Sequence, residues 1–172
     1  MACEVNPALP RQRVAEMSRL VLTTPLGEVA LALLREAAPA TAAHVARLAA
    51  SGAYDGGAAS FYRSDFVIQF GLHGSGKQSA FGPLAVNESG LASRVSNLRG
   101  TAAVAHWDVP DCGDSEAFIN LQDNSHLDAA YGGYCVFARV REDDAASWKT
   151  VAAIADAVKK GGKVPVTKAA VV

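Results

Sequence analysis

Hydrophobic and polar residues alternate along several short segments of the chain, and this pattern predicts β-strands. Residues 18–24 and 27–34 are of this type, and Thr24-Pro25-Leu26-Gly27 joins them with Pro and Gly at positions that favour a β-turn. We therefore expect an antiparallel hairpin there. Further segments with strand character are 101–106, 116–121, 134–140 and 164–172.

Two other segments carry apolar residues at helical spacing. The first opens with Ala38-Pro39-Ala40-Thr41, where Pro suits the first turn, and stops at Ser51-Gly52. The second is expected to begin with Ser147 as its N-cap and to end at Lys159-Lys160-Gly161. Because closure removes exposed edges from a sheet of many short strands, the pattern suggests a closed barrel capped by two helices.

The stretch from Ser60 to Gly71 contains an unusual arginine. Arg63 follows an aromatic pair, and after it Phe66, Ile68 and Phe70 alternate with Val67 and Gln69. A charge in so apolar a setting suggests a functional role. The Gly-, Ser- and Asn-rich segment 72–97 follows, and we expect it to be a long irregular loop that borders a site.

Length and composition indicate one domain in a reducing compartment. The 172 residues suit a single domain, expected at 18–172 after an N-terminal extension at 1–17. A net charge of -1 argues against nucleic-acid and anionic-membrane partners. Cys3, Cys112 and Cys135 lack C-x-x-C spacing, so neither a disulfide framework nor a zinc finger is indicated. With no signal-like start, we expect a cytoplasmic protein.

Three features of the sequence are candidates for a chemical site. Gly71 to Gln78 approaches a phosphate-binding loop, but Gln78 replaces the magnesium-binding hydroxyl, so a flexible glycine loop is the better interpretation. The residues His106, Asp108, Asp111, Cys112 and Asp114 match no familiar metal spacing. No G-x-S-x-G elbow or recognisable Cys/His pair is present. We therefore expect no metal and no cofactor.

The ordered motifs resemble those of the cyclophilin-type peptidyl-prolyl cis-trans isomerases, from about Leu20 to Val140. Phe61-Tyr62-Arg63 with Phe66-Val67-Ile68-Gln69 resembles the family signature F-H-R…F-M-x-Q. Arg99-Gly100-Thr101-Ala102-Ala103-Val104-Ala105 resembles R-G-x-x-x-M-A, Ser115-Glu116-Ala117-Phe118-Ile119 resembles S-Q-F-F-I, and Asp123 to Asp128 resembles D-x-x-x-L-D. The resemblance implies a mainly β fold: a closed eight-stranded antiparallel barrel capped by two α-helices.

The resemblance also implies a reaction and a set of site residues. The reaction is rotation about an X-Pro peptide bond, whose barrier is roughly 20 kcal/mol, in peptide and protein substrates. It breaks no covalent bond. Arg63 would be the catalytic donor, and Gln69 would hold the substrate backbone or orient Arg63. The expected proline slot consists of Phe66, Val67, Phe118 and Leu127, with Ala105, His106, His126 and Tyr134 at its rim.

Departures from the family pattern leave a second interpretation open. Only two residues separate Arg63 from Phe66, where the family usually has four, and Glu116 replaces Gln, so that it could pair with Arg63. The alternative is therefore a low-activity binding module docked in a larger assembly. A small-ligand barrel of another family is a third possibility. His126 stands where the family often has the Trp associated with cyclosporin, which argues against binding of that drug.

Overall fold

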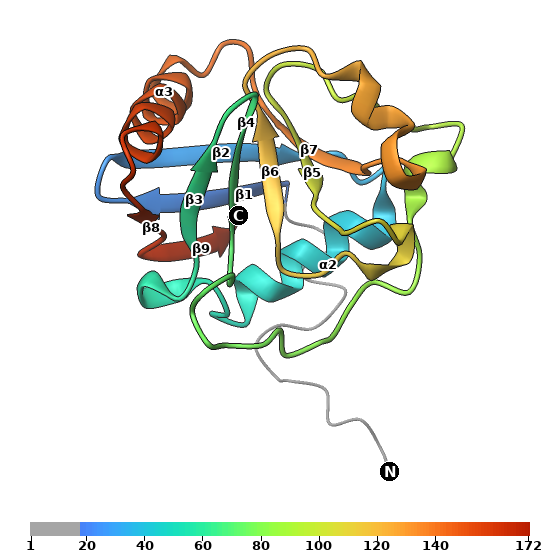
Figure 1. The fold of residues 1–172 in the computed structure, drawn as a ribbon, viewed down its shortest axis with the longest axis horizontal. Helices are drawn as coiled ribbons and strands as arrows, with labels where there is room; N and C mark the ends of the chain where they lie inside the picture. The colour runs from blue at the N-terminus through green and yellow to red at the C-terminus, as the bar shows by residue number, and fades with distance from the viewer. Residues whose placement is uncertain (1–17) are drawn as a thin grey trace.

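The computed structural model describes residues 18–172, so the expected extension at 1–17 lies outside the described residues. The described chain forms one antiparallel sheet and two α-helices (Figure 1). Its strands are β1 Arg19–Thr24, β2 Gly27–Leu33, β3 Ser60–Ser64, β4 Val67–Gly71, β5 Thr101–Val104, β6 Ala117–Asn120, β7 Val136–Val140, β8 Val164–Pro165 and β9 Lys168–Val171. The helices are α2 Pro39–Ala50 and α3 Ala145–Lys159, and short 3₁₀ turns include Glu88–Gly90, Ser125–Asp128 and Ala130–Gly132.

The C-terminal segment closes the barrel by pairing with both edges of the sheet. The strand order is β8-β3-β4-β6-β5-β7-β2-β1-β9, so the two edge strands are neighbours in sequence. Between them, the Val166 N–H donates to Ala59 O (2.9 Å) and the Thr167 N–H donates to Thr23 O (2.8 Å). The expectation of one continuous last strand was wrong, because the chain changes partner at this point. The sheet therefore has nine strands where eight were expected.

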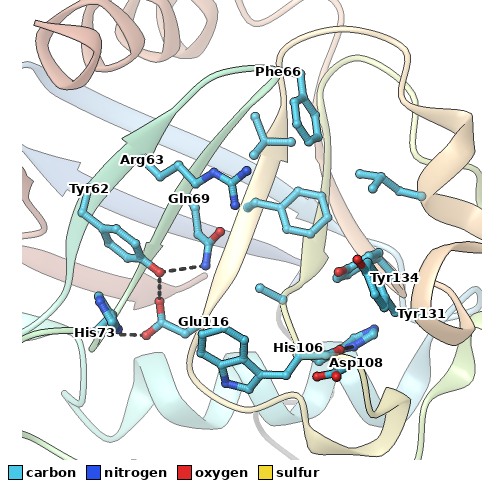
Figure 2. Close-up of a pocket in the computed structure, with 15 residues that line it drawn as sticks. Tyr62, Arg63, Phe66, Gln69, His73, His106, Asp108, Glu116, Tyr131 and Tyr134 are labelled. Atoms are coloured by element: carbon cyan, nitrogen blue, oxygen red, sulfur yellow. Dashed lines mark hydrogen bonds between the residues drawn. The ribbon is translucent and has the colours of Figure 1, made fainter.

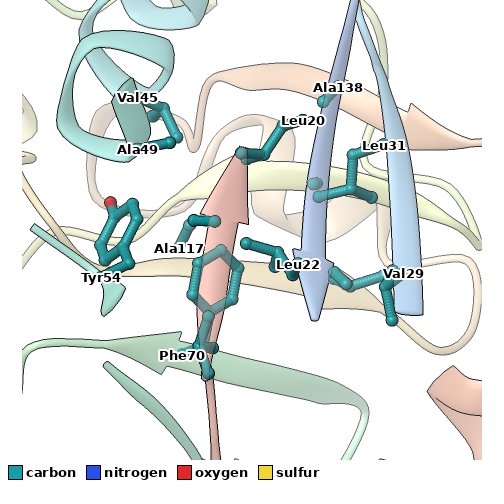
Figure 3. Packing of buried hydrophobic residues seen from close by; sticks show 14 of the residues in the cluster. Leu20, Leu22, Val29, Leu31, Val45, Ala49, Tyr54, Phe70, Ala117 and Ala138 are labelled. Atoms are coloured by element: carbon teal, nitrogen blue, oxygen red, sulfur yellow. The ribbon is translucent and has the colours of Figure 1, made fainter. Parts of the chain in front are cut away.

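The barrel interior is filled by apolar side chains from every layer (Figure 3). Leu20 and Leu22 from β1 and Phe70 from β4 are fully buried, and the Phe61 and Phe70 rings lie 5.1 Å apart. Helix α3 packs against β2 and β3, whereas α2 packs against β9 and β7. The two helices thus cover different ends of the barrel, as Figure 1 shows, and the side of β4 and β6 is left open to a cleft.

The N-terminus of α2 is capped by a residue from the long loop. The Glu88 carboxylate accepts hydrogen bonds from the N–H groups of Ala40 (3.1 Å) and Thr41 (2.7 Å) and from the Thr41 hydroxyl (2.7 Å). The two N–H groups are backbone donors that the start of a helix leaves without partners. The predicted loop 72–97 is irregular apart from the turn at Glu88–Gly90, and this cap ties it to the barrel.

The expected cap of α3 was wrong by one turn. Asp144 is the N-cap, and its carboxylate accepts hydrogen bonds from the Ser147 N–H (3.0 Å) and hydroxyl (2.7 Å). Ser147 is buried, and its Oγ accepts a hydrogen bond from the Ala30 N–H (2.9 Å) on β2. The serine that resembled a cap therefore joins α3 to the sheet.

We predict that Glu88→Ala destabilises the protein by about 1–3 kcal/mol, because buried backbone donors at the start of α2 lose their acceptor. Urea unfolding measures the change. Glu142→Ala, at an exposed position, is the matched control and should change the free energy of unfolding by less than about 0.5 kcal/mol. Equal stability of the two variants would contradict the role of this cap.

Candidate functional site

A cleft of about 590 Å³ opens on the outer face of β3, β4 and β6. Figure 2 shows the side chains that point into it. Its lining residues are Tyr62, Arg63, Phe66, Val67, Gln69, His73, Ala105, His106, Trp107, Asp108, Glu116, Phe118, Leu127, Tyr131 and Tyr134.

The strands beneath the cleft bury side chains on both of their faces. On β4, Ile68 and Phe70 belong to the barrel core, whereas Val67 belongs to a second apolar cluster with Phe118 and Leu127. These three side chains form the floor of the cleft and are 3%, 4% and 8% exposed. Alternation along the strand alone would place Phe66 on the face of Ile68 and Phe70. It packs on the second cluster, with the residues expected to form the slot, because it lies in the turn before β4 begins.

A β-bulge in β3 brings Arg63 to the cleft. Phe61 pairs with Phe70, but the next paired residue is Arg63, opposite Gln69, so that Tyr62 is the extra residue. Residues directly opposite each other lie on the same face of a sheet. Arg63 therefore shares the cleft face with Gln69, while Phe61 shares the core face with Phe70.

The guanidinium of Arg63 is held by the carboxylate of Asp65. Its Nε and Nη2 both lie 2.7 Å from Asp65 Oδ2, and its side chain is 51% exposed. The other oxygen, Oδ1, accepts a hydrogen bond from the Val67 N–H (3.1 Å) and closes the short turn. The guanidinium points into the cleft in Figure 2, 5.8 Å from the centre of the Phe66 ring. Arg63 therefore pairs with Asp65 and not with Glu116, a partner that the sequence left possible.

Glu116 belongs to a hydrogen-bond chain on the other side of Arg63 (Figure 2). Gln69 Nε2 donates to the Tyr62 hydroxyl (2.7 Å), which donates to Glu116 Oε2 (2.7 Å), and the His73 N–H donates to Glu116 Oε1 (2.9 Å). Burial and the bond to Glu116 raise the pKa of Tyr62, so its hydroxyl stays protonated near neutral pH. The side-chain amide of Gln69 is thus oriented by Tyr62, and among the described residues it makes no hydrogen bond to the Arg63 guanidinium.

Close packing against Gly71 helps to hold Glu116. A Cβ atom at Gly71 would lie 2.3 Å from the carboxyl carbon of Glu116. Any larger residue would therefore push the carboxylate away from Tyr62 and His73.

The opposite wall of the cleft consists of stacked rings: the ring centres of His106 and Tyr134 lie 4.3 Å apart, and the ring planes are inclined by 16°. His106 Nε2 lies 2.9 Å from Gly133 O, which fixes the imidazole against the loop.

Three fully buried asparagines support the cleft from below. Asn124 Nδ2 donates to Phe66 O (3.1 Å) and to Asn120 Oδ1 (2.8 Å), and Asn97 Nδ2 donates to Tyr134 O (3.0 Å). Asn120 Nδ2 donates to Asn97 Oδ1 (3.2 Å) and so links the two. The network therefore joins the backbones of Phe66 and Tyr134, which stand on different walls of the cleft.

Asp128 completes this support. Its carboxylate accepts hydrogen bonds from the Ser96 hydroxyl and from the Asn97 N–H (2.8 Å) and Nδ2 (2.9 Å). Partial burial alone raises the pKa of Asp128, but the hydrogen bonds from Ser96 and Asn97 outweigh it and lower the pKa below its ordinary value.

The structure brings together all but one of the side chains expected at the site. His126 is the exception: its ring lies 5.8 Å from the ring of Phe66, outside the cleft lining. The lining residues that the sequence pattern did not identify are Tyr62, His73, Trp107, Asp108 and Tyr131. Aromatic residues inside polar loops were the available signal for Trp107 and Tyr131. The roles assigned to the site residues stay predictions.

Two of the candidate metal ligands, Asp111 and Asp114, have other partners. Asp114 contacts His44 Nε2 (3.1 Å), and Asp111 accepts a hydrogen bond from the Asn87 N–H (2.8 Å). Burial lowers the pKa of His44, against the opposing effect of Asp114. Within residues 18–172, no group of three or more His, Cys, Asp or Glu side chains is placed to hold a metal ion. No described helix is long and apolar enough to cross a membrane.

Comparison with known proteins identifies related sequences and folds. Residues 19–172 match the model of the family described as cyclophilin type peptidyl-prolyl cis-trans isomerase/CLD. Peptidyl-prolyl cis-trans isomerase A of Dickeya dadantii is 36% identical over 128 residues, which are 72% of this chain and 65% of that protein. A peptidyl-prolyl cis-trans isomerase of Acinetobacter baylyi is 32% identical over 124 residues, which are 69% of this chain and 64% of that protein. The matched regions thus span less than two thirds of these relatives.

Solved structures share the fold. A Cryptosporidium parvum cyclophilin-type peptidyl-prolyl cis-trans isomerase superposes with a TM-score of 0.70 at 18% identity, over 91% of this chain and 98% of that one. Its structure in the presence of the dipeptide Ala-Pro has a TM-score of 0.72 at 19% identity, over 90% of this chain and 98% of that one. At this level of identity the similarity concerns the fold alone.

We predict that Asp128 contributes stability that depends on pH. Its folded pKa lies below its unfolded value of about 3.9, so the contribution is present above that value and is lost as pH falls through the folded pKa. Urea unfolding should show wild type more stable than Asp128→Asn at pH 6, with the gap closing as the pH falls below the ordinary aspartate pKa of about 3.9. Asp156→Asn, on the exposed face of α3, serves as the comparison. A gap that is constant with pH would contradict the assignment.

Proposed function

We propose that this chain, which belongs to the cyclophilin-type peptidyl-prolyl cis-trans isomerase family, catalyses rotation about X-Pro bonds in peptides and proteins. The observation that carries the proposal is the position of Arg63. Its guanidinium lines the same cleft as the apolar floor of Val67, Phe118 and Leu127. A proline ring and a donor for its peptide nitrogen are thus accommodated side by side.

The chemistry requires only binding that favours the twisted amide. Resonance in the planar X-Pro bond gives a barrier of roughly 20 kcal/mol, and rotation through 90° returns a lone pair to the nitrogen. An N–H donor that bonds this lone pair stabilises the transition state more than the planar ground state. The Nη1 group of Arg63 is suited to this role, because the contacts to Asp65 use Nε and Nη2.

The other lining residues hold the substrate around that bond. The apolar floor takes the proline ring, and Phe66 and the stacked pair of His106 and Tyr134 limit its movement. The amide of Gln69, oriented by Tyr62, bonds the substrate backbone. The related Cryptosporidium structure was determined in the presence of Ala-Pro, which supports proline-containing peptides as ligands of this cleft.

A second function, binding with little catalysis, is favoured by one observation. Both contacts of Arg63 to Asp65 are short, and tight pairing reduces the freedom of the guanidinium to follow a rotating amide. Such a module would dock proline-containing segments within a larger assembly. The cytoplasmic location and the lack of cyclosporin binding stay predictions.

We predict that wild-type protein accelerates cis-trans exchange in an Ala-Pro-Phe peptide and that Arg63→Ala lowers kcat/KM by about 100-fold or more. Exchange spectroscopy measures both. Arg63→Lys should fall between them, because an ammonium group lacks the planar fork. Arg141→Ala is the matched control, since Arg141 also pairs with an aspartate two residues on, Asp143. Exchange at the uncatalysed rate with wild type would favour the binding module instead.

We also predict a positioning role for Tyr62. Tyr62→Phe removes the acceptor for Gln69 and the donor to Glu116, so kcat/KM should fall by about 3- to 10-fold. The side-chain amide signals of Gln69 in NMR spectra should shift at the same time. Thr23→Val removes a hydroxyl that donates to Glu28 outside the cleft lining, and it lacks both effects if the hydrogen-bond chain is the cause. Unchanged Gln69 signals in Tyr62→Phe would refute the role.

A further inference from the structure

The outer edge of the cleft carries exposed aromatic residues that the isomerisation does not use. Trp107 is 80% exposed and Tyr131 is 63% exposed, the two highest values among the large hydrophobic residues of the described chain. Both line the cleft together with Asp108. We call these three residues the aromatic rim. Exposed aromatic surface beside a binding cleft is typical of a recognition site.

The loops that carry the aromatic rim are fixed to each other. A Cβ atom at Gly132 would lie 2.8 Å from Pro110 Cβ, so the loop after Trp107 packs directly on the loop after Tyr131. Asn87 ties both, because its N–H donates to Asp111 (2.8 Å) and its Nδ2 donates to Gly133 O (2.8 Å). The backbone that carries the rim is therefore held in place, and a ligand has only the rim side chains to order.

The positive and negative side chains around the cleft lie on different sides of it. No lysine or arginine occurs between Gly100 and Ala138, a segment with several acidic residues. Asp108 makes no hydrogen bond or ion pair with any other described residue, whereas Arg63 is paired with Asp65. Figure 2 shows Arg63 and Asp108 on opposite sides of the cleft. The rim thus presents one uncompensated carboxylate beside two aromatic faces.

We propose that the aromatic rim binds a lysine or arginine side chain of the substrate, within about three residues of its proline. This inference rests on the proposed function, because it names the substrate class of the same cleft. A cation over the face of Trp107 or Tyr131 is attracted by the ring, and the carboxylate of Asp108 neutralises its charge. A glutamate at the same place is repelled by Asp108.

The test uses peptides with a single proline. Lysine, norleucine or glutamate is placed at one of the three positions before or the three positions after that proline, and the exchange rates of these peptides are compared by exchange spectroscopy. At one position, kcat/KM for the lysine peptide should exceed that for norleucine by about fivefold, with glutamate lowest. This preference should shrink at about 1 M salt, because the rim is exposed.

Substitutions locate the preference. In Trp107→Ala and in Asp108→Asn, kcat/KM for the lysine peptide should fall close to that for the norleucine peptide measured with the same variant. Asp143→Asn removes the same charge from an exposed residue outside the cleft lining and should keep the preference. Equal rates for all three residue types, or a lysine preference that survives in both rim variants, would overturn the inference.

A binding measurement separates this inference from the proposed catalysis. The chain has two tryptophans, and Trp148 Nε1 donates to Arg141 O, so its indole signal is an internal reference for that of Trp107. Lysine peptides should shift the Trp107 signal at lower concentration than norleucine peptides, also in Arg63→Ala. If no peptide is isomerised but lysine peptides still bind at lower concentration than norleucine peptides, the proposed function fails and the inference about the aromatic rim is supported. If exchange is accelerated but does not differ among the peptides, the proposed function is supported and the inference about the aromatic rim fails.

Discussion

In a regular strand that places Phe61 in the barrel core, Tyr62 would face the cleft and Arg63 would point back into the core. The bulge at Tyr62 removes this conflict, because it shifts the register by one residue before Arg63 pairs with Gln69. Tyr62 and Arg63 therefore both line the cleft. The turn at Asp65 then returns the chain at once into β4, so the short link between Arg63 and Phe66 is compatible with a guanidinium at the site.

The cleft shares its floor with the barrel, and this makes it rigid. Val67 and Phe118 project to one side of β4 and β6, and Ile68 and Ile119 project to the other side into the core. A shift of either strand would disturb two apolar clusters at once, at a cost of several kcal/mol. The buried asparagines add hydrogen bonds that fix the backbones of opposite walls. A rigid slot suits a reaction in which only a peptide bond turns.

Much of the fold was predictable because its signals are local. The turn at Thr24-Pro25-Leu26-Gly27, Pro39 at the start of α2 and the glycine after α3 all act within a few residues. The features that were missed depend on distant partners. Ser147 bonds Ala30 on another element, Glu116 bonds Tyr62 across two strands, and the last strand breaks where the barrel closes. Periodicity along the chain carries no information about such contacts.

The pairing of Arg63 with Asp65 is compatible with its proposed role, since rotation of an amide develops a lone pair but no full charge. The transition state needs a directed N–H donor, and a free cation is not required. A carboxylate that holds Nε and Nη2 directs the remaining Nη1 group and neutralises the charge that would otherwise attract acidic segments. The uncompensated carboxylate of Asp108, on the other side of the cleft, is the group proposed to attract a cationic substrate residue. The hydrogen-bond donor is Arg63 and the charge proposed to select the substrate is on Asp108. Because these are different residues, a substitution can alter substrate selection without altering the donor.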